Sequence, residues 1–158
     1  MPWFVNNGYM EPTSEYFSFH DLMIGEISRA FPLAQATGAA KTLSDWNTFA
    51  LSLFQPGAEH DHGIKVLANR HGTIVGLIVF AIDNDPLHGV VFEVTHLIAF
   101  DRMSAEALIE EAMKIAHDRD CATVRANVGI GDFWLSDFLR RHSFMPERQQ
   151  LLRAVPPS

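Results

Sequence analysis

The chain has 158 residues, of which 47% are hydrophobic and 20% are charged. This length suits one domain, since domains usually span roughly 100–200 residues, and the composition excludes both wholesale disorder and a disulfide-stapled miniature. The formal charge of −7 comes without a cluster of basic residues or a long apolar run, so we expect neither nucleic acid nor a membrane as a partner.

The first third of the chain predicts two helices. Residues 1–13 lack periodicity and predict an irregular arm or a short first strand. From about Ser14 to Pro32, apolar residues recur at helical spacing, and the proline ends the run. These residues are Met23, Ile27, Ala30 and Phe31. A second helix follows a cap at Thr42 or Ser44. Its apolar face consists of Trp46, Phe49, Ala50 and Leu53.

The middle of the chain changes to the period of a strand. Residues 64–68, 73–82 and 90–100 are rich in β-branched and apolar side chains. The segments between them, 69–72 and 83–89, are rich in turn-forming residues. We therefore predict an antiparallel meander of three strands.

Helices and strands alternate in the last third. A helix capped by Asp101 or Ser104 comes first. Its buried stripe is Leu108, Ala112, Ile115 and Ala116. A strand at 121–127, a helix at 133–141 and a strand at 149–155 follow. Because a helical crossover delivers the next strand parallel, the fold class is α/β (α+β), with a mixed, mostly antiparallel sheet and helices on both faces. One domain would cover residues 1–158.

This order of elements resembles the GNAT superfamily of N-acetyltransferases over roughly residues 63–155. Residues 108–116 resemble the central helix of the family, and residues 138–144 resemble its late tyrosine-x-x-x-glycine-phenylalanine signature. The resemblance, to a short and divergent member, implies the GNAT fold and transfer of an acyl group from acetyl-CoA to an amine. The acceptor would be a small molecule or a protein of unknown identity.

The family binds acetyl-CoA where its fourth and fifth strands separate, with the pyrophosphate at the N-terminus of the central helix, which favours anions. The resemblance implies cofactor contacts from Leu97, Ile98, Ala99, Arg102, Met103, Ser104, Ala105 and Asp132. The loop pattern of the family, Arg/Gln-x-x-Gly-x-Gly/Ala, is degenerate here. Only Ala105 fits it, Met103 replaces the first glycine, and Asp101 adds negative charge near the expected pyrophosphate.

The resemblance also suggests catalytic residues. The tyrosine that serves as general acid in the family corresponds to Leu139, which cannot donate a proton. Glu93 and His96, on the predicted strand at 90–100, are candidates for the general base. Strand alternation predicts that Glu93 points to the same face as Thr95 and that His96 points to the other. Glu93 as a surface carboxylate and His96 as a hydrogen-bonded histidine beneath a helix remain alternatives.

Other hypotheses stay open. Met103 and Leu139 suggest a catalytically degenerate binding or assembly module. His60 and His62 have the spacing to share a metal ion, although a solvated loop explains them as well, and no metal is expected. The sequence also leaves open whether the protein forms a homodimer.

The lone Cys121 cannot form an internal disulfide, and the first residues do not resemble a secretory signal, so we expect a cytoplasmic location.

Overall fold

The computed structural model describes residues 17–54, 61–127 and 133–145. The chain divides into two compact units, one that ends at Asn127 and one that begins at Val128. One domain over residues 1–158 therefore stays a prediction. The predicted arm at 1–13 and the predicted strand at 149–155 lie outside the described residues.

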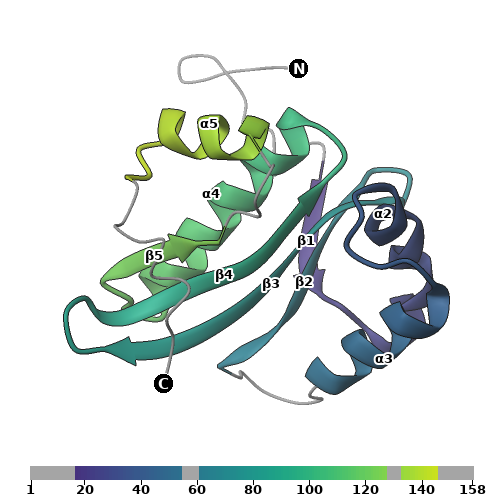
Figure 1. Cartoon of the computed structure of the whole chain (residues 1–158), viewed down its shortest axis with the longest axis horizontal. Helices are drawn as coiled ribbons and strands as arrows, with labels where there is room; N and C mark the ends of the chain where they lie inside the picture. Colours follow the sequence, from purple (N-terminus) through teal and green to yellow (C-terminus); the bar gives the residue numbers. More distant parts are fainter. Residues whose placement is uncertain (1–16, 55–60, 128–132, 146–158) are drawn as a thin grey trace. The chain divides into compact units, whose positions relative to one another are not determined.

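A five-stranded sheet forms the centre of the first unit (Figure 1). Its strands stand in chain order: β1 (Phe17–Asp21), β2 (His62–Asn69), β3 (Ile74–Asp85), β4 (Gly89–Ala99) and β5 (Thr123–Ala126). Neighbouring strands from β1 to β4 are antiparallel, whereas β5 is parallel to β4. This direction follows because the chain crosses over through a helix between β4 and β5. The predicted meander, the parallel strand after it and the mixed, mostly antiparallel sheet are confirmed.

Helices cover both faces of this sheet (Figure 1). Helices α2 (Phe31–Ala36) and α3 (Leu43–Leu53) lie on one face, and α4 (Arg102–Asp118) lies on the other. Thr42 caps α3, since its Oγ1 accepts the N–H of Asp45 at 3.0 Å. The second unit contains α5 (Phe133–Arg141). The predictions of α3, α4 and α5 are confirmed.

The helix predicted from about Ser14 to Pro32 is wrong. The segment instead contains β1, followed by two short 3-10 turns, η1 (Ile24–Glu26) and η2 (Ser28–Ala30). Pro32 stands in the first turn of α2. Proline suits that position because its missing N–H would have no partner within the helix. The alternation of aromatic and polar residues in Phe17–Asp21 was the strand signal, and the helical spacing further along obscured it.

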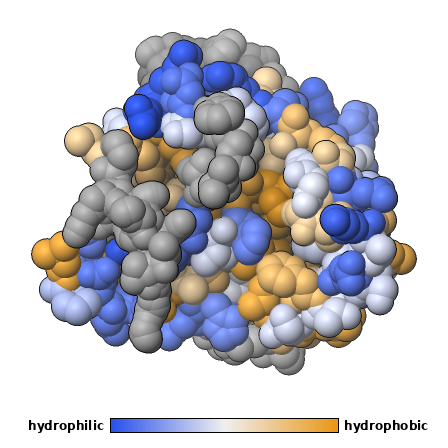
Figure 2. All heavy atoms as spheres, viewed as in Figure 1, coloured by the Kyte–Doolittle hydropathy of each residue, from blue (hydrophilic) through white to orange (hydrophobic). Residues whose placement is uncertain are grey.

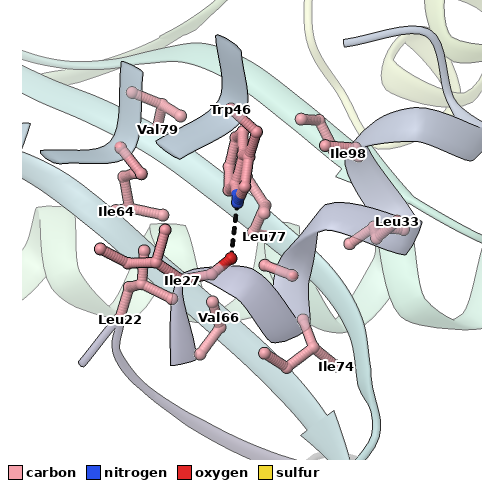
Figure 3. Close-up of a cluster of buried hydrophobic side chains, with 13 residues drawn as sticks. Leu22, Ile27, Leu33, Trp46, Ile64, Val66, Ile74, Leu77, Val79 and Ile98 are labelled. Atoms are coloured by element: carbon pink, nitrogen blue, oxygen red, sulfur yellow. Dashed lines mark hydrogen bonds between the residues drawn. The ribbon is translucent and has the colours of Figure 1, made fainter. Parts of the chain in front are cut away.

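Trp46 is central to the core between the sheet and helices α2 and α3 (Figure 3). The side chain is 1% exposed, and its Nε1 donates a hydrogen bond to the carbonyl oxygen of Ile27 at 2.6 Å. Apolar side chains from the strands, turns and α2 belong to the same cluster. They include Leu22, Leu33, Ile64, Val66, Ile74, Leu77, Val79 and Ile98. Burial of each such side chain contributes about 1.5–3 kcal/mol, so this cluster holds α2 and α3 on the sheet.

Alternate strand residues point to the opposite face, where α4 packs. The rings of Phe80 on β3 and Phe92 on β4 are stacked there, with centroids 5.2 Å apart. Gly76 allows the helix to approach the sheet closely. A Cβ atom at this position would lie 2.9 Å from Cδ1 of Leu108 on α4, closer than side-chain atoms approach one another in proteins.

A buried carboxylate ties β1 to the turn that follows it. Glu26 is 8% exposed, and its oxygens accept hydrogen bonds from His20 Nε2 and from the N–H of Met23, both at 3.0 Å. Burial raises the pKa of Glu26, but the hydrogen bonds from His20 and Met23 and the charge of Arg29 outweigh it, so the pKa lies below its ordinary value. The ionised carboxylate therefore stabilises this corner of the fold.

Hydrophilic residues dominate much of the surface over the hairpin of β3 and β4, whereas hydrophobic residues show between hydrophilic ones over α2 and α3 (Figure 2). Within the part of the chain that the structure describes, no helix is both long and apolar enough to span a membrane.

In α5, the Asp137 carboxylate pairs with the Arg141 guanidinium at 3.0 Å, one turn along the helix.

Candidate active site

A β-bulge in β4 determines where the two predicted catalytic side chains point. His96 lies opposite Val79 of β3. Glu93 lies opposite Ala81, two residues further along β3, so the register shifts and Thr95 is the extra residue. Residues two apart on a strand point to one face, so Glu93 and His96 share a face. The prediction that they point to opposite faces is wrong, because regular alternation does not allow for an inserted residue.

The shared face is the one that α2 and α3 partly cover. The ring of His96 meets the ring of Phe49 on α3 edge-on, with centroids 5.6 Å apart. The imidazole still reaches solvent. Desolvation by its apolar neighbours lowers the pKa of His96, which favours the neutral imidazole. A neutral imidazole is the form that accepts a proton.

The hydroxyl of Thr95 joins the bulge to His96. Thr95 Oγ1 lies 3.1 Å from the carbonyl oxygen of Val79, to which it donates a hydrogen bond across the two strands. The same oxygen lies 3.2 Å from Nδ1 of His96. Strand periodicity gives Thr95 no role, and helical spacing favours a place in the core for Phe49 over one in a ligand pocket. No sequence signal marks either contact.

Glu93 belongs to a polar cluster with β5. Its Oε2 accepts a hydrogen bond from Nδ2 of Asn127 at 3.2 Å, and its Oε1 lies 3.8 Å from the Arg125 guanidinium. Arg125 also pairs with Asp85 at 2.8 Å, and this hydrogen bond is the main reason why the pKa of Asp85 falls to about 2. The Glu93 carboxylate is partly engaged, but with about four acceptor sites it can accept further hydrogen bonds.

β4 continues beyond the end of its pairing with β5. The parallel register extends only to Val94, and no described strand pairs with the rest of β4 on that side. The N–H of Phe100 donates to the carbonyl oxygen of Val75 at 3.2 Å, so the backbone of Phe100 faces β3. Because backbone groups alternate sides along a strand, those of Leu97 and Ala99 point to the edge without a described partner. Such an edge can hydrogen-bond to an extended amide-containing ligand.

The N-terminus of α4 is capped by its own acidic residue. Asp101 Oδ1 accepts the N–H of Ser104 at 2.8 Å, and the Asp101 carbonyl oxygen accepts the N–H of Ala105 at 3.0 Å. The carboxylate therefore occupies one of the donors that an anion would use, and adds a negative charge there. Met103 is 56% exposed beside this cap, whereas Ser104 and Ala105 are buried.

The other residues that the sequence singled out lie in different parts of the structure or outside the described residues. Ile98 belongs to the buried core cluster, and Arg102 is the first residue of α4. Asp132 and His60 lie outside the described residues. Leu139 lies on α5 in the second unit. Among the described residues, no group of three or more His, Cys, Asp or Glu side chains is arranged to hold a metal ion.

Solved structures share this fold. An aminoglycoside N-acetyltransferase, AAC(6')-Iy, in complex with CoA is 12% identical with a TM-score of 0.67, over 86% of this chain and 92% of that chain. A GNAT family acetyltransferase from Staphylococcus aureus is 10% identical with a TM-score of 0.62, over 74% of this chain and 90% of that chain. Glucosamine-6-phosphate N-acetyltransferase from Arabidopsis thaliana is 15% identical with a TM-score of 0.63, over 91% of this chain and 97% of that chain.

The chain therefore has a divergent form of the GNAT fold, as its sequence predicted. At these identities the likeness establishes the fold alone. No protein-family model matches the sequence, and no curated protein matches it either.

Proposed function

We propose that this protein is an acyltransferase that moves an acyl group from acyl-CoA to a primary amine of a small molecule or a protein. An acetyl group is the expected cargo. The proposal rests above all on the bulge at Thr95. It brings an imidazole and a carboxylate to one face of β4, directly before the edge formed by Leu97 and Ala99.

The acyl donor fits the edge of β4 better than it fits the N-terminus of α4. The pantetheine arm of CoA contains amides, which suit the backbone groups of Leu97 and Ala99. The pyrophosphate fits less well, because Asp101 already accepts the Ser104 N–H and would repel an anion. We therefore expect binding that is dominated by the arm, with an affinity reduced by the cap.

In this proposal His96 is the general base. Its Nε2 takes the proton that the amine nitrogen loses as the bond between nitrogen and acyl carbon forms. The bond between the acyl carbon and sulfur breaks, and the sulfur leaves with the electron pair. A thiol of pKa about 8.5 is a good leaving group even without a proton donor, so the reaction can proceed with leucine at position 139, at a reduced rate. Glu93 attracts the cationic form of the acceptor, which loses one proton to solvent before the neutral amine attacks.

The test is release of free thiol from acetyl-CoA in the presence of a panel of amines, with mass spectrometry of the acetylated product. His96→Ala should lower kcat/KM at pH 7 by on the order of 10²-fold, a usual contribution of a general base. His71→Ala is the matched control, because His71 is exposed in the turn between β2 and β3. The role of His96 would be disproved if both variants kept the activity of the wild type.

A second function deserves the same assay. The acidic cap at Asp101 and the leucine at 139 favour a GNAT-fold binding or assembly module without catalysis. Such a module would release no thiol with any amine and would gain no thermal stability from acetyl-CoA at millimolar concentration, because only ligands that bind the folded state stabilise it. Saturable stabilisation together with thiol release would exclude this alternative.

A further inference from the structure

The Thr95 hydroxyl touches two acceptor-capable atoms but carries a single hydrogen. Oγ1 lies 3.1 Å from the carbonyl oxygen of Val79 and 3.2 Å from Nδ1 of His96. A carbonyl oxygen can only accept, so both contacts can be hydrogen bonds at once only if the hydroxyl donates its hydrogen to Val79. The contact with His96 can then be a hydrogen bond only if Nδ1 carries the proton and Oγ1 accepts it.

This arrangement decides which ring nitrogen is basic. A neutral imidazole has one N–H and one lone pair, and the partner of one nitrogen selects the role of the other. With the proton on Nδ1, the lone pair belongs to Nε2. Histidine side chains in water favour the opposite tautomer, with the proton on Nε2, so a specific partner is needed to reverse the preference.

Two further contacts keep the ring in place. The bulge sets the backbone position of Thr95 and His96 through the register with β3. Phe49 on α3 packs edge-on against the imidazole at 5.6 Å between centroids. Val79 is itself 4% exposed and belongs to the core cluster, so the carbonyl that anchors the hydroxyl comes from a packed core residue.

We propose that Thr95 is a positioning residue whose hydroxyl, fixed by the Val79 carbonyl, holds His96 in the Nδ1–H tautomer and leaves the Nε2 lone pair to accept a proton. The catalytic consequence rests on the proposed function, but the tautomer itself does not. Because the hydroxyl acts through His96, Thr95 need not touch the substrate.

The decisive measurement is the long-range ¹H–¹⁵N NMR spectrum of His96 in the labelled full-length chain above its titration range, with His96→Gln to assign its signals. The protonated and unprotonated nitrogens of a neutral imidazole have distinct shifts, so the spectrum reports the tautomer. We expect Nδ1–H as the major form in the wild type and in Thr95→Ser. In Thr95→Val, which keeps the shape of the side chain but lacks the hydroxyl, Nε2–H should become the major form.

The proposal is overturned if Nε2–H already dominates in the wild type, or if Thr95→Val and Thr95→Ser give the same spectrum. Kinetics provide a separate arm. Thr95→Val should lower kcat roughly tenfold, a loss typical of removing the partner that orients a metal-bound histidine, and should leave KM for acetyl-CoA unchanged. Thr95→Ser should restore kcat. An inactive wild type with the expected tautomers would contradict the proposed function and leave the assignment of Thr95 intact.

Discussion

Replacement of Asp101 by asparagine should strengthen acyl-CoA binding. Asparagine is as good a helix N-cap as aspartate, so the hydrogen bond to the Ser104 N–H and the fold should persist. The variant removes only the negative charge from the N-terminus of α4. A pyrophosphate bound there would then meet the partial positive charge of the helix without an opposing carboxylate.

Coulomb's law gives the size of the effect. The Asp101 carboxylate is bound to the first turn of α4, so a pyrophosphate at this terminus would come within roughly 6–8 Å of it. At a dielectric constant of about 80, as in water, repulsion between the single charge of Asp101 and the two charges of the pyrophosphate costs on the order of 1–1.5 kcal/mol. Partial exclusion of water from the site raises this cost to about 2 kcal/mol. Asp101→Asn should therefore lower Kd for acetyl-CoA roughly 5- to 30-fold.

Isothermal titration calorimetry at low ionic strength measures this change. Asp118→Asn is the matched control, since it removes the same charge from the last residue of α4, where the side chain is 80% exposed. Added salt should narrow the gap between the wild type and Asp101→Asn, because screening weakens the repulsion. Equal affinities of the wild type and Asp101→Asn, or an equal gain in Asp118→Asn, would refute the placement of the pyrophosphate at this helix end.

Three further predictions concern stability and pH. Gly76→Ala should lower the free energy of unfolding by about 1–3 kcal/mol in urea titrations, because its methyl group would displace Leu108. Glu26→Gln should lower it by about 1–3 kcal/mol at pH 7, because a buried charged hydrogen-bond network is lost. The ratio of kcat/KM in the wild type to kcat/KM in His96→Ala should fall in acid with a midpoint below about 6.5, because burial lowers the pKa of His96 and only the neutral imidazole accepts a proton.

Each of these has a control or a contrary outcome. Gly25→Ala meets nothing within 4 Å and should change stability by less than about 0.5 kcal/mol. The folded-state pKa of Glu26 is lowered, so its stabilisation is present above the unfolded value of about 4.3 and is lost as pH falls through the folded value. The gap between the wild type and Glu26→Gln should thus close in acid, and a gap that widens there would contradict the network. A midpoint of that ratio above 6.5 would exclude His96 as the base.

The sequence predicted most of the sheet because the strand segments show their character locally. The run from Thr73 to Ile82 is apolar and β-branched, and turn-forming residues separate it from its neighbours. The parallel fifth strand followed from the connecting helix. The error lay at β1, where five residues form an edge strand. An edge strand is stabilised by pairing with β2, which local periodicity does not report.

The candidate site was harder to predict because tertiary contacts create it. Glu93 and His96 were selected by residue type and strand, but their common face depends on the bulge at Thr95. Neither glycine nor proline marks that bulge, and regular alternation gave the wrong face for His96. The contact between His96 and Phe49 joins residues 47 positions apart in the chain. The cap at the start of α4 was one of two alternatives in the sequence, and the structure chose Asp101.

The most direct test of the central proposal, acyl-CoA binding along the edge of β4, is an acetyl-CoA titration followed by amide ¹H–¹⁵N NMR of the full-length chain. We expect saturable shifts at the N–H groups of Leu97 and Ala99, with smaller changes on β1 and β2, which lie on the other side of β3. An absence of shifts at Leu97 and Ala99 up to millimolar acetyl-CoA, or saturable shifts confined to other strands, would contradict the proposal.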